Sequence, residues 1–397
     1  MTNTQDFKSL WNLDDKITFL NHGSFGACPQ QVLAEQNRLR ARLESEPVRF
    51  FIRDFFPLLD AARKAVAAFI KADSDDLAFV TNATTGVNTV LRSLHLAPGD
   101  EIMVTDQGYA ACTNAAQVVS EIGHASLKSV AMPFPVASED EIVAAILATV
   151  TSKTRLAIID HITSPTALIY PVHKIVKELA ARNVDVLVDG AHAPGMVALD
   201  LRTLAPAYYT GNCHKWLCAP KGSAFLYVRA DRRDAVMPLV ISHGLKWPTA
   251  KRSHYHNLFD WPGTFDPTPY LSVPFAIAYL GSLLPGGWEE LCHNNHRKVV
   301  NARSLLCREL GLEIVAPEHL LGAMATMILP HSPQYRPDPQ AEIHPLQDAL
   351  FHQFGIEVPV MSWANRLLLR ISAQLYNHEA EYLKLLAALR QLVHSSQ

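Results

Sequence analysis

Two charged residues near the middle of the chain could do chemistry together. Lys215 follows a short apolar segment, and its neighbours are His214, Trp216 and cysteines rather than charged residues. Asp189 ends an apolar run that begins at Val184. A lysine in a poorly solvated pocket has a lowered pKa and can form a Schiff base with an aldehyde. The plain alternatives are a solvated surface lysine and an aspartate that caps a turn.

The two residues fit the two ends of one pyridoxal phosphate (PLP) molecule. Lys215 would bond the aldehyde carbon. The carboxylate of Asp189 would face the pyridinium nitrogen and keep it protonated, which makes the ring a better electron sink. His192, three residues after Asp189, could hydrogen-bond the phenolic oxygen of the ring, or could simply pack in the turn. The pair therefore predicts PLP as the cofactor.

These residues need a scaffold that brings several strand ends together. Between residues 77 and 228, strand-like and helix-like segments alternate. This alternation predicts an α/β domain with a mostly parallel sheet and helices on both faces. In such sheets ligands lie at the carboxyl ends of the strands. The expected strands are 77–81, 101–105, 126–132, 155–161, 184–188 and 223–228, with one more before Lys215.

After Leu271 the pattern changes to α+β. Helices are expected near 271–284, 288–310, 343–354 and 377–394, and strands near 312–315, 323–329, 356–360 and 366–371. We therefore expect a large PLP-binding domain at residues 1–270 and a smaller α+β domain at residues 271–397. Segment 1–28 of the large domain could pack with the smaller one.

Three further groups have both a chemical and a plain interpretation. Residues 82–86 (Asn-Ala-Thr-Thr-Gly) lie where a strand gives way to a helix, so backbone N–H groups there could bind a phosphate. Thr84 or Thr85 could instead be a simple N-cap. Tyr109 could stack on a flat cofactor or be an ordinary buried tyrosine. Arg370 lies in an apolar strand and needs an anion, either a structural salt bridge or a substrate carboxylate.

Composition excludes several other classes of protein. The 397 residues are 49% hydrophobic and 18% charged, which is typical of a soluble globular protein of about two domains. A net charge of -3 gives no reason to expect nucleic acid or a membrane surface as partner. We find no signal peptide, no run of roughly 18 apolar residues, no C-x-x-C pair and no H-E-x-x-H. A cytoplasmic protein with reduced cysteines and no metal site is expected.

Taken together, the motifs resemble those of class V aminotransferase-type PLP enzymes of fold type I. Within that group the chain most resembles the isopenicillin N epimerase-like branch, which is related to the cysteine desulfurases and the C–S lyases. The motifs that carry the resemblance run in the family's order over nearly the whole chain, at residues 19–26, 81–86, 161–167, 189–192, 214–215, 261–264 and 370–377.

The resemblance implies roles for particular residues. Lys215 would be the Schiff-base lysine, Asp189 the partner of the ring nitrogen, His192 the donor to the phenolic oxygen and Tyr109 the stacking ring. The remaining contacts would be Ala83, Thr84, Asn212 and His214 with the phosphate, Thr163 and Ser164 near the ring, and Asn21, His22 and Arg370 with the substrate. A homodimer is implied, in which Thr264 reaches the phosphate of the neighbouring subunit. Gln107 departs from the family pattern, where a histidine is expected.

The reaction is left open among related outcomes. With an amino acid substrate, Lys215 would remove the Cα proton and the ring would delocalise the charge. Return of a proton to the opposite face gives an epimerase or racemase, which is an isomerase and the expectation from the branch. The alternatives are a C–S β-lyase acting on a cysteine derivative or its sulfoxide, and a class V aminotransferase, which is a transferase. A non-catalytic PLP-fold binding protein is the alternative from another class.

Persulfide chemistry of the cysteine desulfurase type is disfavoured by the sequence. That chemistry needs a nucleophilic cysteine on a loop in the C-terminal part of the chain. The loop-like stretch at residues 330–339 has no cysteine, and the last cysteine of the chain is Cys307.

Overall fold

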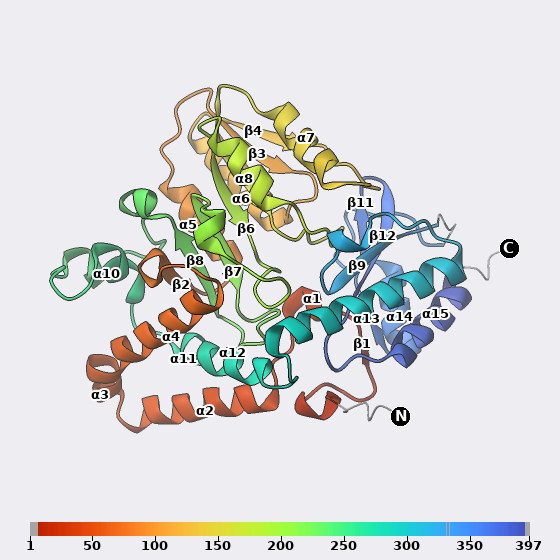
Figure 1. The fold of residues 1–397 in the computed structure, drawn as a ribbon, viewed down its shortest axis with the longest axis horizontal. Coiled ribbons are helices and arrows are strands. Elements are labelled where there is room, and N and C mark those ends of the chain that lie inside the picture. Colours follow the sequence, from red (N-terminus) through yellow and green to blue (C-terminus); the bar gives the residue numbers. More distant parts are fainter. Residues whose placement is uncertain (1–6, 331, 333, 394–397) are drawn as a thin grey trace.

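The computed structural model describes residues 7–330, 332 and 334–393, and a seven-stranded sheet forms its centre (Figure 1). The strands lie in the order β2-β8-β7-β6-β5-β3-β4. Their bounds are Leu77–Val80 (β2), Glu101–Thr105 (β3), Ser126–Val130 (β4), Thr154–Asp160 (β5), Asp185–Asp189 (β6), Tyr208–Asn212 (β7) and Ala224–Val228 (β8). Only β8 runs against the other strands of this sheet. The predicted mostly parallel α/β sheet is confirmed.

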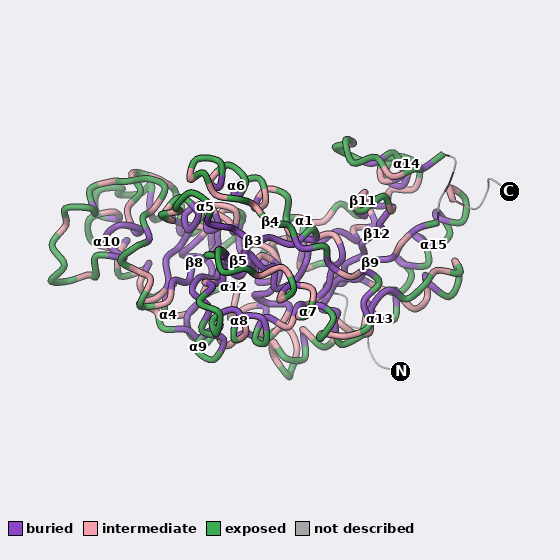
Figure 2. Tube along the Cα trace, turned by 90° about the horizontal axis from the view of Figure 1, so that it is seen from above, coloured by how far each residue is buried: buried purple, intermediate pink, exposed green. Residues whose placement is uncertain are grey.

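The central strands are buried on both faces. Ile158 and Leu187 pack into one hydrophobic core, whereas Ile159 and Val188 pack into the core on the opposite face. Figure 2 shows these strands as a buried layer inside more exposed outer segments. The first face is covered by α5 (Ala83–Ser93), α6 (Ala110–Ile122) and α10 (His254–Asp260), and the second by α2 (Gln30–Ser45), α4 (Phe55–Phe69), α7 (Glu139–Thr149), α8 (Val172–Ala180) and α12 (Val273–Gly281).

The C-terminal part of the chain has a hydrophobic core of its own, at the right of Figure 1. Its antiparallel sheet has the order β11-β12-β9 and packs against three helices. The bounds are Met324–Leu329 (β9), Val360–Trp363 (β11), Arg366–Ser372 (β12), Gly287–Leu310 (α13), Pro345–Phe354 (α14) and Glu379–Val393 (α15). This is the smaller α+β part that the sequence predicted.

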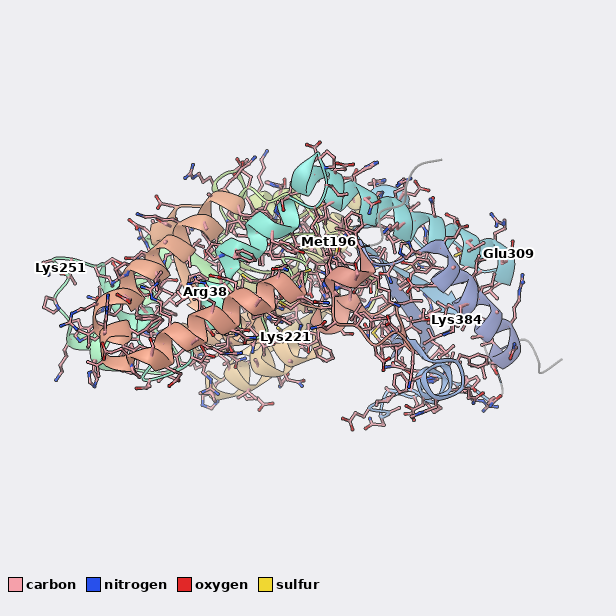
Figure 3. The ribbon with its side chains drawn as sticks, turned by 90° about the horizontal axis from the view of Figure 1, so that it is seen from below. Arg38, Met196, Lys221, Lys251, Glu309 and Lys384 are labelled. Atoms are coloured by element: carbon pink, nitrogen blue, oxygen red, sulfur yellow. The ribbon has the colours of Figure 1, made fainter. Side chains whose placement is uncertain are left out.

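The N-terminal segment packs against this C-terminal part. Strand β1 (Thr18–Phe19) pairs in parallel with β10 (Ile356–Glu357), and Leu20 joins the C-terminal core. Lys384, labelled on α15 in Figure 3, donates a 3.0 Å hydrogen bond to Thr18 Oγ1. Helices α11 (Thr268–Leu271) and α12 pack with α2 and α4, so they belong to the core of the large sheet. The division of domains near residue 271 stays a prediction.

One expected strand is wrong. Residues 312–315 form no strand, because the end of α13 uses the first of them. Gly311 takes a left-handed conformation (φ 64°), and the Leu312 N–H bonds back to the Cys307 carbonyl. Val315 then accepts a single backbone hydrogen bond, from Val136. Of the helices in the described part of the chain, none has the length and apolar character needed to cross a bilayer.

A buried cluster of charges fixes α10 to α4. Arg63 of α4 donates to Asp60 at 2.9 Å and to Asp260 of α10 at 2.5 Å. Arg252 donates to the same two carboxylates at 2.6–2.8 Å. The side chains of Arg63 and Asp260 are only 4% and 1% exposed. Because two arginines face two carboxylates, each buried charge is paired and the cluster is neutral.

We expect Asp260→Asn to lower the free energy of unfolding by about 3–5 kcal/mol, because it leaves buried arginine charge unpaired. Urea unfolding of purified protein measures this loss. The matched control is Glu178→Gln, which breaks an exposed ion pair with Arg182 in which both side chains are 42% exposed. The control should change the free energy by no more than about 0.5 kcal/mol. Equal effects of the two substitutions would contradict a stabilising role for the cluster.

Candidate active site

The carboxyl ends of β5, β6 and β7 border a cavity of about 430 Å³. Most of the residues predicted for the site line it, although they come from five separate segments of the chain. Those residues are Ala83, Thr84, Tyr109, Ser164, Asp189, His192, Asn212, His214 and Lys215. The cavity therefore lies where a parallel sheet is expected to hold a ligand.

Asp189 is a buried carboxyl group that forms no ion pair with the described residues. Its side chain lies at the end of β6 and is 3% exposed. Oδ1 accepts the Ala191 N–H at 2.9 Å, and Oδ2 accepts the Cys112 S–H at 3.2 Å. Burial raises the pKa of Asp189, and the Ala191 N–H opposes that rise. No cation of the described residues forms an ion pair with this carboxylate, so a protonated ring nitrogen would supply the missing positive charge.

Lys215 follows β7 and faces the same cavity. Its Nζ lies 3.2 Å from Nε2 of His192. Burial, and then the positive charge of Arg370, lower the pKa of Lys215 to about 8, against the opposing effect of Asp189. A lysine with this pKa is partly neutral near neutral pH, and only the neutral amine attacks an aldehyde or accepts a proton. The side chain therefore has the chemistry that a Schiff-base lysine needs.

His192 is held by Trp216, a contact that sequence reasoning missed. The indole N–H of Trp216 donates to Nδ1 of His192 at 3.3 Å. Burial, together with Lys215, lowers the pKa of His192 well below its ordinary value, so the ring is neutral. A neutral imidazole that accepts at Nδ1 carries its proton on Nε2. His192 therefore presents an N–H donor to the cavity, as a phenolic oxygen of a cofactor requires.

The start of α5 also lines the cavity. Its N-cap is Asn82, whose Oδ1 accepts the Thr85 N–H at 2.8 Å, rather than Thr84 or Thr85. The Ala83 N–H donates to Oδ1 of Asn212 at 2.8 Å. Among the described residues, the N–H of Thr84 has no hydrogen-bond partner. An open N–H at a helix N-terminus suits a phosphate group.

Two glycines let α5 and the loop that carries Lys215 pack close enough to form the cavity. Gly86 of α5 packs directly on Thr210 of β7, where any Cβ would collide with the threonine hydroxyl. Gly26 has a φ of 69° and packs on the backbone of residues 214–215. A side chain at either position would push its segment away from the site.

Arg370 of β12 has no carboxylate partner in the described part of the chain, so it makes no structural salt bridge there. Its Nη1 donates to the carbonyl and hydroxyl of Ser164, at 2.6 and 3.2 Å, and its Nη2 donates to Oγ of Ser24 at 3.2 Å. Its Nε is buried without a partner, and the side chain is 2% exposed. A buried guanidinium with only neutral partners needs an anion, and a carboxylate matches its geometry.

Asn21 and His22 support the site rather than line its cavity. Asn21 accepts the Ser24 hydroxyl at 2.6 Å and so places the serine that Arg370 contacts. Burial lowers the pKa of His22 to about 3, so its ring is neutral. One ring nitrogen contacts the Lys215 carbonyl at 3.0 Å and the other the Tyr376 hydroxyl at 2.8 Å. The structure therefore gives both residues a positioning contact, and direct substrate contact stays a prediction.

The other predicted residues lie at different depths. Tyr109 lines the cavity and is 47% exposed, so its ring is open to a ligand. Thr163 is fully buried behind the wall, in a 2.7 Å contact with the Thr166 hydroxyl. Thr264 is exposed and lies outside the cavity of its own chain. Gln107, which replaces the expected histidine, is buried and accepts the Thr166 hydroxyl at 2.7 Å.

Ser24, Phe25, Asp160 and Lys221 also line the cavity without having been predicted. Lys221, labelled in Figure 3, donates a 3.0 Å hydrogen bond to the Gly26 carbonyl. Asp160 ends the strand beside β6, and an acid in that position of the sequence was the available signal. Ser24 and Phe25 lie in the motif at residues 19–26, which was the available signal for them, whereas Lys221 gave none.

Comparison with known proteins identifies the family of the chain. The model of the aminotransferase class-V family matches residues 27–262. The chain is 35% identical over 395 residues to an isopenicillin N epimerase of Amycolatopsis lactamdurans, covering 96% of each chain. It is 30% identical over 411 residues to a putative L-cysteine desulfhydrase of Oryza sativa subsp. japonica, covering 95% of this chain and 83% of the relative. The chain belongs to the class-V aminotransferase family.

A solved structure confirms the fold. A variant of C-DES with glycine covalently linked to its PLP cofactor has a TM-score of 0.78 and 21% sequence identity, over 98% of this chain and 99% of the other. The fold is that of the fold type I PLP-dependent transferases. The protein is a PLP-dependent enzyme, and the buried carboxylate, lysine and helix N-terminus around its cavity fit that cofactor.

The capture of PLP by the cofactor-free protein should depend on pH through Lys215. Because only the neutral amine reacts and the pKa of Lys215 is lowered to about 8, the rate should rise through a midpoint near pH 8. In Arg370→Gln the midpoint should move upward, because a positive charge that disfavours the protonated lysine is gone. Stopped-flow absorbance measures both. A wild-type midpoint near the ordinary lysine value of about 10.4 would contradict the site described here.

Trp216→Phe should weaken PLP binding about five-fold, because the loss of one buried hydrogen bond costs about 1 kcal/mol and frees the His192 tautomer. The visible absorbance of bound PLP should also shift in its pH dependence. The matched control is Trp288→Phe, which removes an indole N–H that bonds the Ile277 carbonyl away from the cavity. Equal dissociation constants for the two variants would show that Trp216 acts by packing alone.

Proposed function

We propose that the protein acts at Cα of an amino-acid-type substrate and that its reaction is an epimerisation or racemisation. One observation carries the proposal. A single cavity is lined by a lysine of lowered pKa and a buried carboxylate that forms no ion pair, and a buried arginine without an anion contacts Ser24 and Ser164 of its wall. Similarity to isopenicillin N epimerases at 35% and 32% identity, over 96% of this chain in each case, supports the choice of reaction.

The residues divide the work at the two ends of the substrate. Bound PLP supplies an electron sink that stabilises negative charge at Cα. Arg370 binds the substrate carboxylate and so places the Cα hydrogen near Lys215, which removes that proton as the neutral amine. Asp189 would hold the ring nitrogen of PLP, and His192 would donate a hydrogen bond to its phenolic oxygen.

Epimerisation also needs a proton donor on the face away from Lys215. Tyr109 is our candidate for this group, because it lines the cavity and carries a hydroxyl. Its second expected role is to stack on the ring, which is compatible with proton transfer from the phenolic oxygen. A lysine and a tyrosine on opposite faces would let the proton leave on one side and return on the other.

A C–S β-lyase is the second candidate. The desulfhydrase relative at 30% identity supports it, and C-DES, the structural neighbour, is described as a cystine C–S lyase. A class V aminotransferase is the third outcome, on the family match alone. Persulfide transfer has less support, because no cysteine lines the cavity in the described residues and Cys307 is buried in α13.

We also propose a cytoplasmic homodimer in which Thr264 reaches the neighbouring phosphate. An exposed apolar segment supports it: Leu239, Val240 and Ile241 are 44%, 52% and 51% exposed. The first two also line an apolar cavity of about 240 Å³ that reaches Thr81, a residue of the PLP cavity wall. An apolar patch beside an active site is typical of an interface. All six cysteines are free thiols, which suits a reducing compartment.

Incubation with amino acids in heavy water, followed by NMR, tests the reaction. With isopenicillin N or a related amino acid, we expect deuterium at Cα together with loss of chirality. Lys215→Ala should slow exchange about 10²–10⁴-fold, because the general base is gone. Formation of pyruvate, ammonia and sulfide from cysteine would identify the protein as a C–S β-lyase instead of an epimerase. Formation of glutamate from 2-oxoglutarate would identify it as an aminotransferase. No Cα exchange with any substrate would contradict the proposal.

The shared site is tested by mixing two inactive variants. Lys215→Ala and Thr264→Ala, co-expressed with different tags, should form hybrid dimers in which one site has both wild-type residues. We expect the hybrid to bind PLP more tightly than the Thr264→Ala homodimer and to recover activity that the Lys215→Ala homodimer lacks. Monomers in light scattering, or hybrids no better than the parents, would contradict the shared site.

A further inference from the structure

Asp160 carries a second carboxyl group beside that of Asp189, and the proposed reaction assigns no role to Asp160. The two residues are direct partners in the parallel register of β5 and β6. Two positions earlier, Ile158 and Leu187 pack into the same hydrophobic core under α5 and α6. Since alternate residues of a strand point to one face, the two carboxyl groups lie side by side on that face at the end of the sheet.

The surroundings of the pair favour a charge on Asp189. Asp189 accepts hydrogen bonds from the Ala191 N–H and the Cys112 thiol. Asp160 accepts the backbone N–H groups of Tyr109 and of Asp160 itself, but burial and the charge of Asp189 outweigh them. Its Oδ2 lies against Gly108, where a Cβ would be 3.3 Å away. Both aspartates are buried, at 5% and 3% exposure.

The nearby titratable groups offer Asp160 no cation of its own. The titratable groups that interact electrostatically with Asp160 are Asp189, Cys112, Lys215 and Tyr170. Asp106 also raises the pKa of Tyr170. Burial, and then the charge of Asp189, raise the pKa of Asp160 well above its ordinary value. Burial also raises the pKa of Cys112, which stays a thiol. Two adjacent buried carboxyl groups do not both ionise, so the less stabilised one keeps its proton.

The geometry points to Asp160 as a neutral carboxylic acid that positions Tyr109 and limits the pair to one negative charge facing the ring nitrogen. This inference rests on the PLP site of the proposed function. The acid oxygen that accepts the Tyr109 N–H fixes the turn from which the tyrosine enters the cavity. A single charge is enough to pair with one pyridinium, and a second would also favour the protonated, unreactive form of Lys215.

Asp160→Asn tests the charge in the PLP-loaded protein. An amide has the shape of the neutral acid and still accepts the Tyr109 N–H. We therefore expect the dissociation constant of PLP to change by less than about two-fold. The pH midpoint of the visible absorbance of bound PLP should also move by less than about 0.3 units. If Asp160 were ionised, the substitution would remove a negative charge near Lys215 and lower that midpoint by on the order of one pH unit. That result would overturn the inference.

Asp160→Ala tests the positioning of Tyr109. Without an acceptor for the Tyr109 N–H, PLP binding should weaken about five-fold and the visible circular dichroism of bound PLP should change. The asparagine variant keeps the acceptor and should keep both signals, whereas Asp160→Leu, which fills about the same space without an acceptor, should lose them. A merely space-filling role would not predict that difference. Equal behaviour of the alanine and asparagine variants would overturn the positioning role.

Infrared difference spectra read the proton directly and need no catalysis. The wild-type minus Asp160→Asn spectrum at neutral pH should contain the C=O band of a protonated carboxylic acid, with and without PLP. The control is Asp231→Asn, an exposed aspartate whose pKa is lowered by its hydrogen bond to Arg229, and it should show carboxylate bands only. Carboxylate bands from Asp160 in the PLP-loaded protein would overturn the inference. An acid band in a protein without Cα exchange would leave Asp160 as inferred and contradict only the proposed function.

Discussion

The site depends on opposite charges that are buried around one cavity without partners of their own. Asp189 and Arg370 are buried, at 3% and 2% exposure, Lys215 is half-buried, and none of the three forms an ion pair within the described chain. Leaving such charges uncompensated costs several kcal/mol each. A zwitterionic cofactor and an anionic substrate would compensate all three, and the neutral donors around them, from His192 to the start of α5, complete the fit.

The fold makes this arrangement possible by joining distant segments at one sheet edge. The central strands supply the aspartate and the lysine, because parallel strands present all their carboxyl ends together. The C-terminal sheet supplies Arg370 on β12, and the N-terminal turn at Ser24 meets it there. Trp216, Gly26 and Gly86 then fix the lysine loop and α5 at short range. The site therefore needs both hydrophobic cores, because neither core alone positions all of its residues.

The parts of the structure that could be predicted from the sequence are those determined by short stretches of neighbouring residues. The alternation of strand-like and helix-like segments predicted the sheet and its helices. Charged residues at or in apolar strands led to the prediction of Asp189, Lys215 and Arg370 as site residues. Contacts between distant segments were not predictable in this way. The antiparallel direction of β8, the hydrogen bond from Trp216 to His192 and the pairing of Asp160 with Asp189 depend on strand order and loop paths. The strand expected at 312–315 failed because the helix end at Gly311 used its first residue.

Borohydride reduction of the PLP-loaded protein, followed by peptide mass spectrometry, tests the central assignment most directly. Reduction makes the bond between the lysine and the cofactor permanent, so the modified peptide identifies the lysine that holds PLP. The structure predicts one phosphopyridoxyl group per chain, on Lys215, and none on the neighbouring Lys221, which also lines the cavity. Modification of Lys221 instead, or an unmodified Lys215 in a protein saturated with PLP, would contradict the assignment of the active site.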